Sequence, residues 1–126
     1  MLEAHQNGDQ VLALTPVATA AELLAAQDAA ARVRASAPLR EYIVNLLWRT
    51  RDDPRVELGA SPRAGLMLLR AAKAHAMMGG RDHALPDDVQ ALAVPVLAHR
   101  LMLAPETPRA AARDVILDAV SSTRAL

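Results

Sequence analysis

The sequence has no cysteine and no long apolar run, and each absence removes a class of protein. Without cysteine there is neither a disulfide framework nor thiol chemistry, which allows an intracellular origin without showing it. No apolar stretch approaches the roughly 20 residues that cross a bilayer, and the N-terminal residues do not resemble a signal peptide. We therefore expect a cytoplasmic protein with no membrane partner.

Net charge is also missing, because 14 basic side chains balance 14 acidic ones. Such a chain presents no strong field to a polyanion, so we expect no nucleic-acid partner, and a helix-turn-helix DNA binder is disfavoured. Lys73 is the only lysine. A basic set made of arginine favours bidentate ion pairs or phosphate contacts, although GC-rich coding produces the same bias, and both interpretations stay open.

Motifs for free-standing catalysis are absent as well. No glycine-rich phosphate loop followed by lysine and serine or threonine occurs, so this chain alone cannot cradle a nucleoside triphosphate in the usual way. The acidic residues lie in expected helix caps or loops, and the four histidines have no i, i+4 pair, which leaves no metal-ligand spacing. We expect neither a metal site nor an enzyme active on its own.

The most informative stretch present is residues 56–80, which contains a strong helix start. Ser61 is a good N-cap residue, and Pro62 suits the first helical position because its missing N–H needs no partner there. The glycine pair at 79 and 80 predicts the end of this helix. Helical spacing places Gly65, Leu68, Leu69, Ala72 and Ala76 on one face, with Arg63 and Arg70 on the opposite one.

Arg63 is unusual because the first turn of a helix already carries partial positive charge. An arginine there is unfavourable by about 0.3–1 kcal/mol unless an anion lies in front of it. A bound anion explains the residue. The alternatives are a solvated surface arginine, or an ion pair with Glu57 or Asp53 across the preceding loop.

Two helices are predicted before this one. Thr19 and Glu22 form a capping box that starts a helix over residues 20–34, with Leu23, Ala26, Ala30 and Val33 facing inward. Ser36 and Pro38 start a second helix that ends at Asp52, Asp53 and Pro54, and residues 52–60 then form a loop. The inward face of the second helix comprises Leu39, Tyr42, Ile43, Leu46, Leu47 and Thr50.

Two more helices are predicted after it. Pro86 with Asp87 and Asp88 starts one, and Pro95 should kink it or end it early. Its inward face comprises Val89, Leu92, Ala93, Val96 and Leu97. Thr107 and Pro108 signal the last helix, whose inward face comprises Ala112, Val115, Ile116, Ala119 and Val120.

The fold predicted from these elements is an all-α, compact bundle of about five helices, within one domain at this length. Residues 99–103 favour an extended conformation. Two short extended pieces, residues 11–14 and 100–103, are candidates to pair at the edge of the bundle. We expect a linker over residues 1–16 and the helical domain over residues 17–126.

Trp48 allows two interpretations. On the second helix it lies with Val44 opposite the main apolar face, so the helix is apolar on two sides. Either the helix is buried all round, or Trp48 and Val44 form an exposed patch made for another domain or a partner protein.

The run at residues 57–101, ELGASPRAGLMLLRAAKAHAMMGGRDHALPDDVQALAVPVLAHRL, resembles the C-terminal lid of MoxR-type AAA+ ATPases. The likeness extends upstream through residues 39–51 and 14–33 in the family order, and residues 1–9 resemble the tail leaving the ATPase core. In the family, the Gly-Ala-Ser-Pro-Arg-Ala signature holds the second-sensor arginine, which matches Arg63 here.

The resemblance implies a lid that closes over ATP and Mg²⁺ held mainly by a separate core domain, within a hexameric, chaperone-like ring ATPase. Partners would be the core, neighbouring subunits and von Willebrand A-type proteins. Arg63 would approach the γ-phosphate, Ser61 and Pro62 would aim it, and Gly59 and Ala60 would leave room for the nucleotide. The alternative is a stand-alone helical interaction or regulatory module without nucleotide chemistry.

Overall fold

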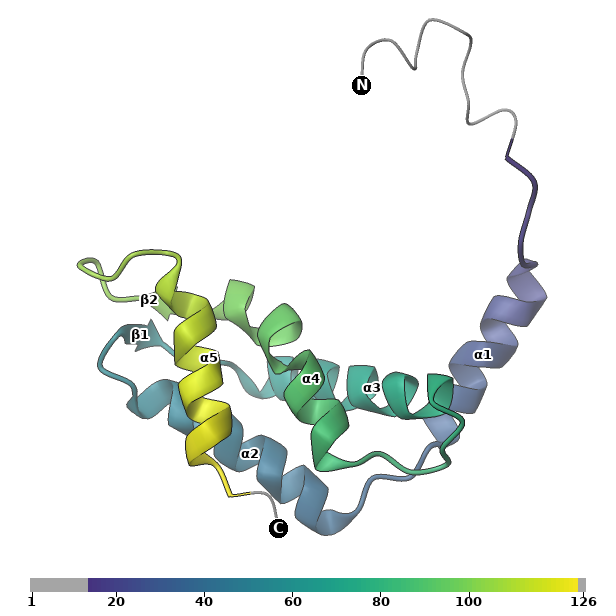
Figure 1. The fold of residues 1–126 in the computed structure, drawn as a ribbon, viewed down its shortest axis with the longest axis horizontal. Coiled ribbons are helices and arrows are strands. Elements are labelled where there is room, and N and C mark those ends of the chain that lie inside the picture. The colour runs from purple at the N-terminus through teal and green to yellow at the C-terminus, as the bar shows by residue number, and fades with distance from the viewer. Residues whose placement is uncertain (1–13, 125–126) are drawn as a thin grey trace, which may run out of the picture.

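The protein is a bundle of helices with a small two-stranded ribbon at one end (Figure 1), in a computed structural model that describes residues 14–124. Its elements in chain order are α1 Ala20–Arg32, α2 Ala37–Asp52, β1 Val56–Leu58, α3 Pro62–Met78, α4 Pro86–Leu97, β2 Met102–Leu103 and α5 Ala111–Ser122. The all-α class and the five helices are thus confirmed within the described residues.

Side-chain caps fix the start of the first three helices, as predicted. The Thr19 hydroxyl accepts a hydrogen bond from the amide of Glu22 at 3.2 Å, and the Glu22 carboxylate accepts one from the amide of Thr19 at 2.7 Å. Ser36 caps α2 by accepting from the amide of Leu39 at 3.2 Å, and Ser61 caps α3 in the same way. These bonds satisfy amides that a helix N-terminus otherwise leaves without partners.

The core lies between α2, α3, α4 and α5. The buried residues of α2 are the six predicted: Leu39, Tyr42, Ile43, Leu46, Leu47 and Thr50. On α3 the buried face includes Gly65, where an added Cβ would lie 2.6 Å from the Leu47 Cδ1 atom. Glycine at this position therefore lets α2 and α3 approach each other closely.

The predicted inward face of α1 is wrong at Leu23 and Ala26, which are exposed, whereas Val33, just after the end of the helix, is buried as predicted. This helix has no buried side chain, and Leu23 and Leu24 are 58% and 62% exposed. Figure 1 shows α1 projecting away from the other helices, and its C-terminal end lies against α3, where Lys73 donates to the carbonyl of Ala31. A period of 3.6 residues marks an apolar stripe without saying what covers it, and here nothing among the described residues covers most of it.

The ribbon differs from the prediction in its first strand. β2 does form within residues 100–103, but it pairs antiparallel with β1, with Val56 opposite Leu103 and Leu58 opposite Met102. Residues 52–60 are therefore not loop throughout, and the predicted partner at residues 11–13 lies outside the described residues. Strands of three and two residues are too short to show the alternation that identifies a strand in a sequence.

Three expected boundaries also need correction. α4 continues past Pro95 to Leu97, so the early end is wrong and the kink at Pro95 stays a prediction. The chain then tightens into a 3-10 turn at Ala98–Arg100, so residues 99–103 are extended only at their end. The last helix begins at Ala111, because Thr107 and Pro108 form a turn in which Pro108 accepts from the amide of Ala111 at 2.9 Å. Buried Leu97 explains the longer α4, since continuing the helix places that side chain in the core.

A buried carboxylate joins α3 to α4. Asp88, 1% exposed, accepts two hydrogen bonds from the Arg81 guanidinium at 2.7 and 2.6 Å. It also bonds His75 Nδ1 at 2.6 Å and accepts from the amide of Leu85 at 2.8 Å. The Arg81 guanidinium, with the Leu85 and His75 bonds, holds the pKa of Asp88 well below its usual range. Asp88 therefore does more than mark the start of a helix, which is the role that the sequence predicts for it.

We predict that Asp88→Asn destabilises the domain by about 2–3 kcal/mol at neutral pH, because a buried charged acceptor of four hydrogen bonds is lost. The lowered pKa of Asp88 stabilises the fold above the unfolded-state pKa of about 3.9, and this stabilisation is lost as pH falls towards the native value. Urea unfolding from pH 7 to 3 should give a flatter acid limb for the variant. Asp87→Asn, at an exposed neighbour, is the control, and equal losses for both variants would refute the role of Asp88.

Candidate functional site

The backbone before α3 is held by the buried C-terminal end of α2. The Thr50 hydroxyl, fully buried, accepts from the amide of Ala60 at 3.0 Å and donates to the carbonyl of Leu47 at 2.7 Å. Nη2 of Arg51 donates to the carbonyl of Ala60 at 3.1 Å. Both backbone polar groups of Ala60 are therefore bonded to α2, which fixes the residue immediately before the Ser61 cap.

Gly59 lies against the same part of α2. A Cβ added at Gly59 would lie 2.4 Å from Arg51 Cγ and 2.9 Å from Arg51 Cα. The second contact is with the backbone, so a change of side-chain rotamer could not remove the clash. The close contact with α2 therefore explains why residue 59 is a glycine, without any reference to a nucleotide. The role of Gly59 and Ala60 in leaving room for a nucleotide stays a prediction.

The first turn of α3 has few free backbone donors. Ser61 Oγ accepts from the amide of Ala64 at 3.3 Å, the Ser61 carbonyl accepts from Gly65, and Pro62 has no N–H. Within residues 14–124 this leaves the amides of Ser61 and Arg63 without a hydrogen-bond acceptor at this helix start. A helix N-terminus with an open amide favours an anion.

The Arg63 side chain extends from this turn into solvent. It is exposed, and across the described residues it forms no ion pair or hydrogen bond. The first turn of α3 contains no acidic residue. Of the alternatives weighed from the sequence, the ion pair with Glu57 or Asp53 is therefore wrong, and a solvated or anion-binding guanidinium remains.

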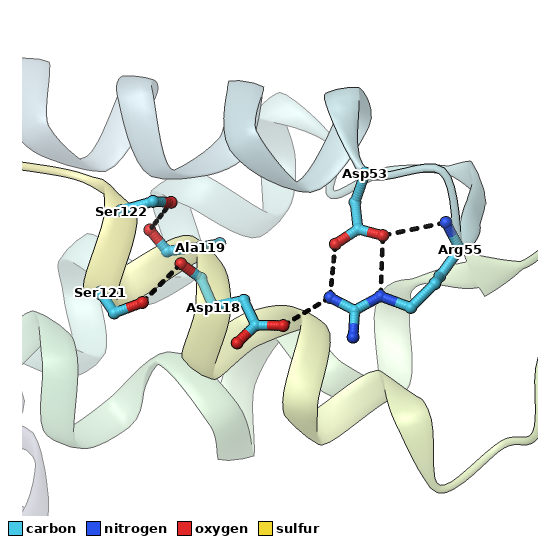
Figure 2. A network of polar contacts seen from close by, with 6 residues as sticks. All are labelled: Asp53, Arg55, Asp118, Ala119, Ser121 and Ser122. Atoms are coloured by element: carbon cyan, nitrogen blue, oxygen red, sulfur yellow. Dashed lines mark hydrogen bonds and ion pairs between the residues drawn. The ribbon is translucent and has the colours of Figure 1, made fainter.

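Asp53 is unavailable to Arg63 because Arg55 engages it. Figure 2 shows the Arg55 guanidinium donating to both oxygens of Asp53, at 2.9 and 2.7 Å, and to Asp118 of α5 at 2.6 Å. The Arg55 bonds lower the pKa of Asp53, and the two carboxylates raise the pKa of Arg55. This network attaches the turn before β1 to α5.

An apolar groove of about 500 Å³, the α2–α3 groove, lies beside the same helix start. Its buried or half-buried side is formed by Ile43, Leu47, Gly65 and Leu69, and its exposed side by Val44, Trp48 and Leu66. Trp48 is 55% and Val44 49% exposed, so the expectation that α2 is buried all round is wrong. The Arg51 guanidinium lies over the Trp48 ring, 4.9 Å from its centroid, in a cation–π contact.

The described histidines are either bonded to an aspartate or exposed, so none of them indicates a second site. His75 bonds Asp88, His83 bonds Asp82 at 2.9 Å, and His99 is exposed. No group of three or more metal-ligating side chains occurs in residues 14–124. One charged fork on a helix end can bind a phosphate, so a phosphate contact at Arg63 stays a prediction.

Sequence reasoning missed Thr50 and Arg51 as the residues that hold this segment. It placed Thr50 correctly on the buried face of α2. The available signal was a hydroxyl on an otherwise apolar stripe, because a buried hydroxyl needs a hydrogen-bond partner. The identity of that partner depends on how the chain folds back, which spacing within one helix does not reveal.

Comparison with known proteins places the chain among ATPase lids. Residues 49–119 match the family described as AAA lid domain. The chain is 39% identical over 106 residues to the uncharacterised protein YeaC of Bacillus subtilis, a match that covers 84% of this chain and 33% of that protein. It is 36% identical over 104 residues to protein MoxR of Paracoccus denitrificans, covering 71% of this chain and 31% of that protein.

Two further similarities agree with these. Chaperone MoxR1 of Mycobacterium tuberculosis is 36% identical over 91 residues, covering 65% of this chain and 24% of that protein. A crystal structure of a candidate ATPase from Cytophaga hutchinsonii shares the fold, with a TM-score of 0.82 and 24% identity, and the match covers 98% of this chain and 40% of that one. The chain thus spans about a third of the length of the curated relatives it matches.

None of the described helices is both long and apolar enough to cross a bilayer.

We predict that Thr50→Val destabilises the domain by about 1–3 kcal/mol, because it leaves the buried Ala60 amide without an acceptor at nearly unchanged volume. Thr50→Ser keeps the hydroxyl and is the matched control. Urea unfolding measures stability, and amide exchange measures protection at Ala60. Fast exchange at Ala60 in the valine variant alone is expected, whereas slow exchange in both variants would mean that another group holds this segment.

Proposed function

The chain belongs to the AAA lid domain family, as a lid of the MoxR type, and on that basis we propose that it closes over ATP bound by a separate core domain. In this proposal the lid couples hydrolysis to chaperone-like remodelling of protein partners. The observation that carries it is Arg63, an exposed guanidinium with no partner in residues 14–124, at the capped start of α3.

The donors at this helix start suit a phosphate group. A planar guanidinium matches two phosphate oxygens, and the free amide of Arg63 adds positive potential at the same helix end. One side chain and one amide do not make a full nucleotide site. We therefore assign the remaining phosphate contacts, and the Mg²⁺, to the core domain.

Bound ATP supplies the γ-phosphoryl group that is transferred to water. Arg63 offsets the negative charge that grows on that group, and it does so without reorganising, because Ser61 and Pro62 hold it on a capped helix. Thr50 and Arg51 hold the preceding backbone. Loss of the γ-phosphate removes the partner of Arg63 and so favours release of the lid.

The domain arrangement is part of the proposal. Residues 17–126 form the lid, and residues 1–16 link it to the core. By its likeness to MoxR proteins, we place the lid in a cytoplasmic ring, a hexamer, with neighbouring subunits and von Willebrand A-type proteins as partners. The name of one relative, chaperone MoxR1, supports a chaperone-like role.

A second candidate function is a helical interaction module without nucleotide chemistry. The exposed α2–α3 groove favours it, because an apolar patch open to water marks a binding surface. The two candidates differ in whether Arg63 matters. Only the ATPase lid requires its guanidinium for turnover.

We expect the isolated chain not to hydrolyse ATP and to bind it more weakly than about 0.1 mM, because a single arginine and a helix end do not replace a phosphate loop. Isothermal titration with MgATP measures this. Stoichiometric binding at low micromolar concentration would show that the nucleotide site needs no core.

In the ATPase that contains this lid, Arg63→Ala should lower turnover more than ATP affinity. One charged donor directed at a transition state contributes about 2.7–4 kcal/mol, or roughly a hundred- to thousandfold in rate. Arg63→Lys should recover little, because lysine lacks the planar fork. Steady-state ATPase assays give turnover, and a separate binding measurement gives affinity.

Arg70→Ala is the matched control. Arg70 is exposed and lies about two turns further along α3, roughly 10 Å from Arg63 along the helix axis. Its loss should change turnover by no more than a few fold. Equal losses at both positions would indicate a general electrostatic face, and an unaltered rate for Arg63→Ala would leave Arg63 a solvated surface residue.

A further inference from the structure

The α2–α3 groove has the shape of a site for another helix. It runs between two helices that lie side by side, and its apolar side chains continue from α2 across Gly65 to Leu66 and Leu69 of α3. Gly65 forms part of its floor, where α2 and α3 pack closely against each other. Among the described residues, no other segment covers Val44, Trp48 or Leu66, which are all exposed.

The charges that line the groove are all positive. Arg40 lies near the start of α2 and Arg51 near its end, and no acidic residue lines the groove. Eleven residues of helix separate the two arginines by about 16 Å. Both guanidinium groups retain free donors, because Arg40 bonds the carbonyl of Ala35 through Nη1 alone and Arg51 bonds Ala60 through Nη2 alone.

From this arrangement we propose that the groove binds an acidic amphipathic helix of a partner protein. Two or three apolar side chains of that helix lie between Val44, Trp48 and Leu66, and carboxylates near its two ends pair with Arg40 and Arg51. Apolar anchors at helical spacing are the usual way a helix occupies a groove, and opposite charge at the ends sets its position. The assignment deepens the second candidate function and holds whether or not the lid closes over ATP.

Trp48 reports directly on this groove because it is the only tryptophan of the chain. The probe is a synthetic capped helical peptide of about 15 residues with leucines at i, i+4, i+7 and i+11 and glutamates at both ends. A second peptide carries lysine in place of each glutamate. Titration followed by Trp48 emission, without nucleotide, should show a Kd of about 0.1 mM or below for the acidic peptide and binding about tenfold weaker for the basic one.

Two substitutions test the contacts, each with a matched control elsewhere. Val44→Asp should abolish binding of the acidic peptide, whereas Leu117→Asp, at an exposed position of α5, should leave it unchanged. Arg40→Glu should reverse the preference between the two peptides, whereas Arg113→Glu should not. Helical circular dichroism and thermal melts confirm that each variant is folded.

Three results would overturn the proposal. Equal affinity for the acidic and basic peptides would remove the charge selection, and a folded Val44→Asp variant that still binds would place the peptide elsewhere. The third result would come from sedimentation of the chain alone. A dimer that Val44→Asp abolishes would show that the groove binds a second copy of this chain and not a partner helix. Because no nucleotide is present, each of these leaves the proposed ATP role of Arg63 untouched.

Discussion

The hydrogen bond from the Ala60 amide to the buried Thr50 hydroxyl is the contact on which the candidate site depends. It joins the C-terminal end of α2 to the residue before the α3 cap, and the Arg51 bond to the Ala60 carbonyl completes the attachment. An unpaired amide at this depth costs about 1–3 kcal/mol, so the segment has one favourable position. The next residues along the chain are Ser61, Pro62 and Arg63. Their position therefore depends on the attachment of Ala60 to α2.

The sequence predicts what is decided within a few residues. Thr19 with Glu22, Ser36 and Ser61 each mark a helix start, because the capping bond spans three residues. The buried face of α2 follows from spacing alone. The pairing of Arg55 with Asp118 and of β1 with β2 joins residues far apart in the chain, and local spacing contains no information about either.

Local spacing also fails to predict which apolar helix faces are buried. The stripe on α1 and the Val44–Trp48 side of α2 are read from spacing as readily as the core face of α2, yet both are exposed. Helical periodicity identifies a surface that gains from being covered, and the covering element comes from the rest of the fold or from another protein. For the candidate site, Arg63 and its cap could be predicted, whereas its support by Thr50 could not.

The state of Arg63 follows from where the nearby acids are used. Asp53 and Glu57 are close in sequence, and either could have neutralised an arginine placed unfavourably at the positive end of a helix. The fold instead commits Asp53 to Arg55, which binds Asp118 as well, so that the network that attaches the turn before β1 to α5 also engages one of these two carboxylates (Figure 2). Moving Asp53 to Arg63 would break two hydrogen bonds from the Arg55 guanidinium and one from the Arg55 amide. An exposed guanidinium at this helix start is therefore a consequence of the fold, and it stays available to an anion from outside the domain.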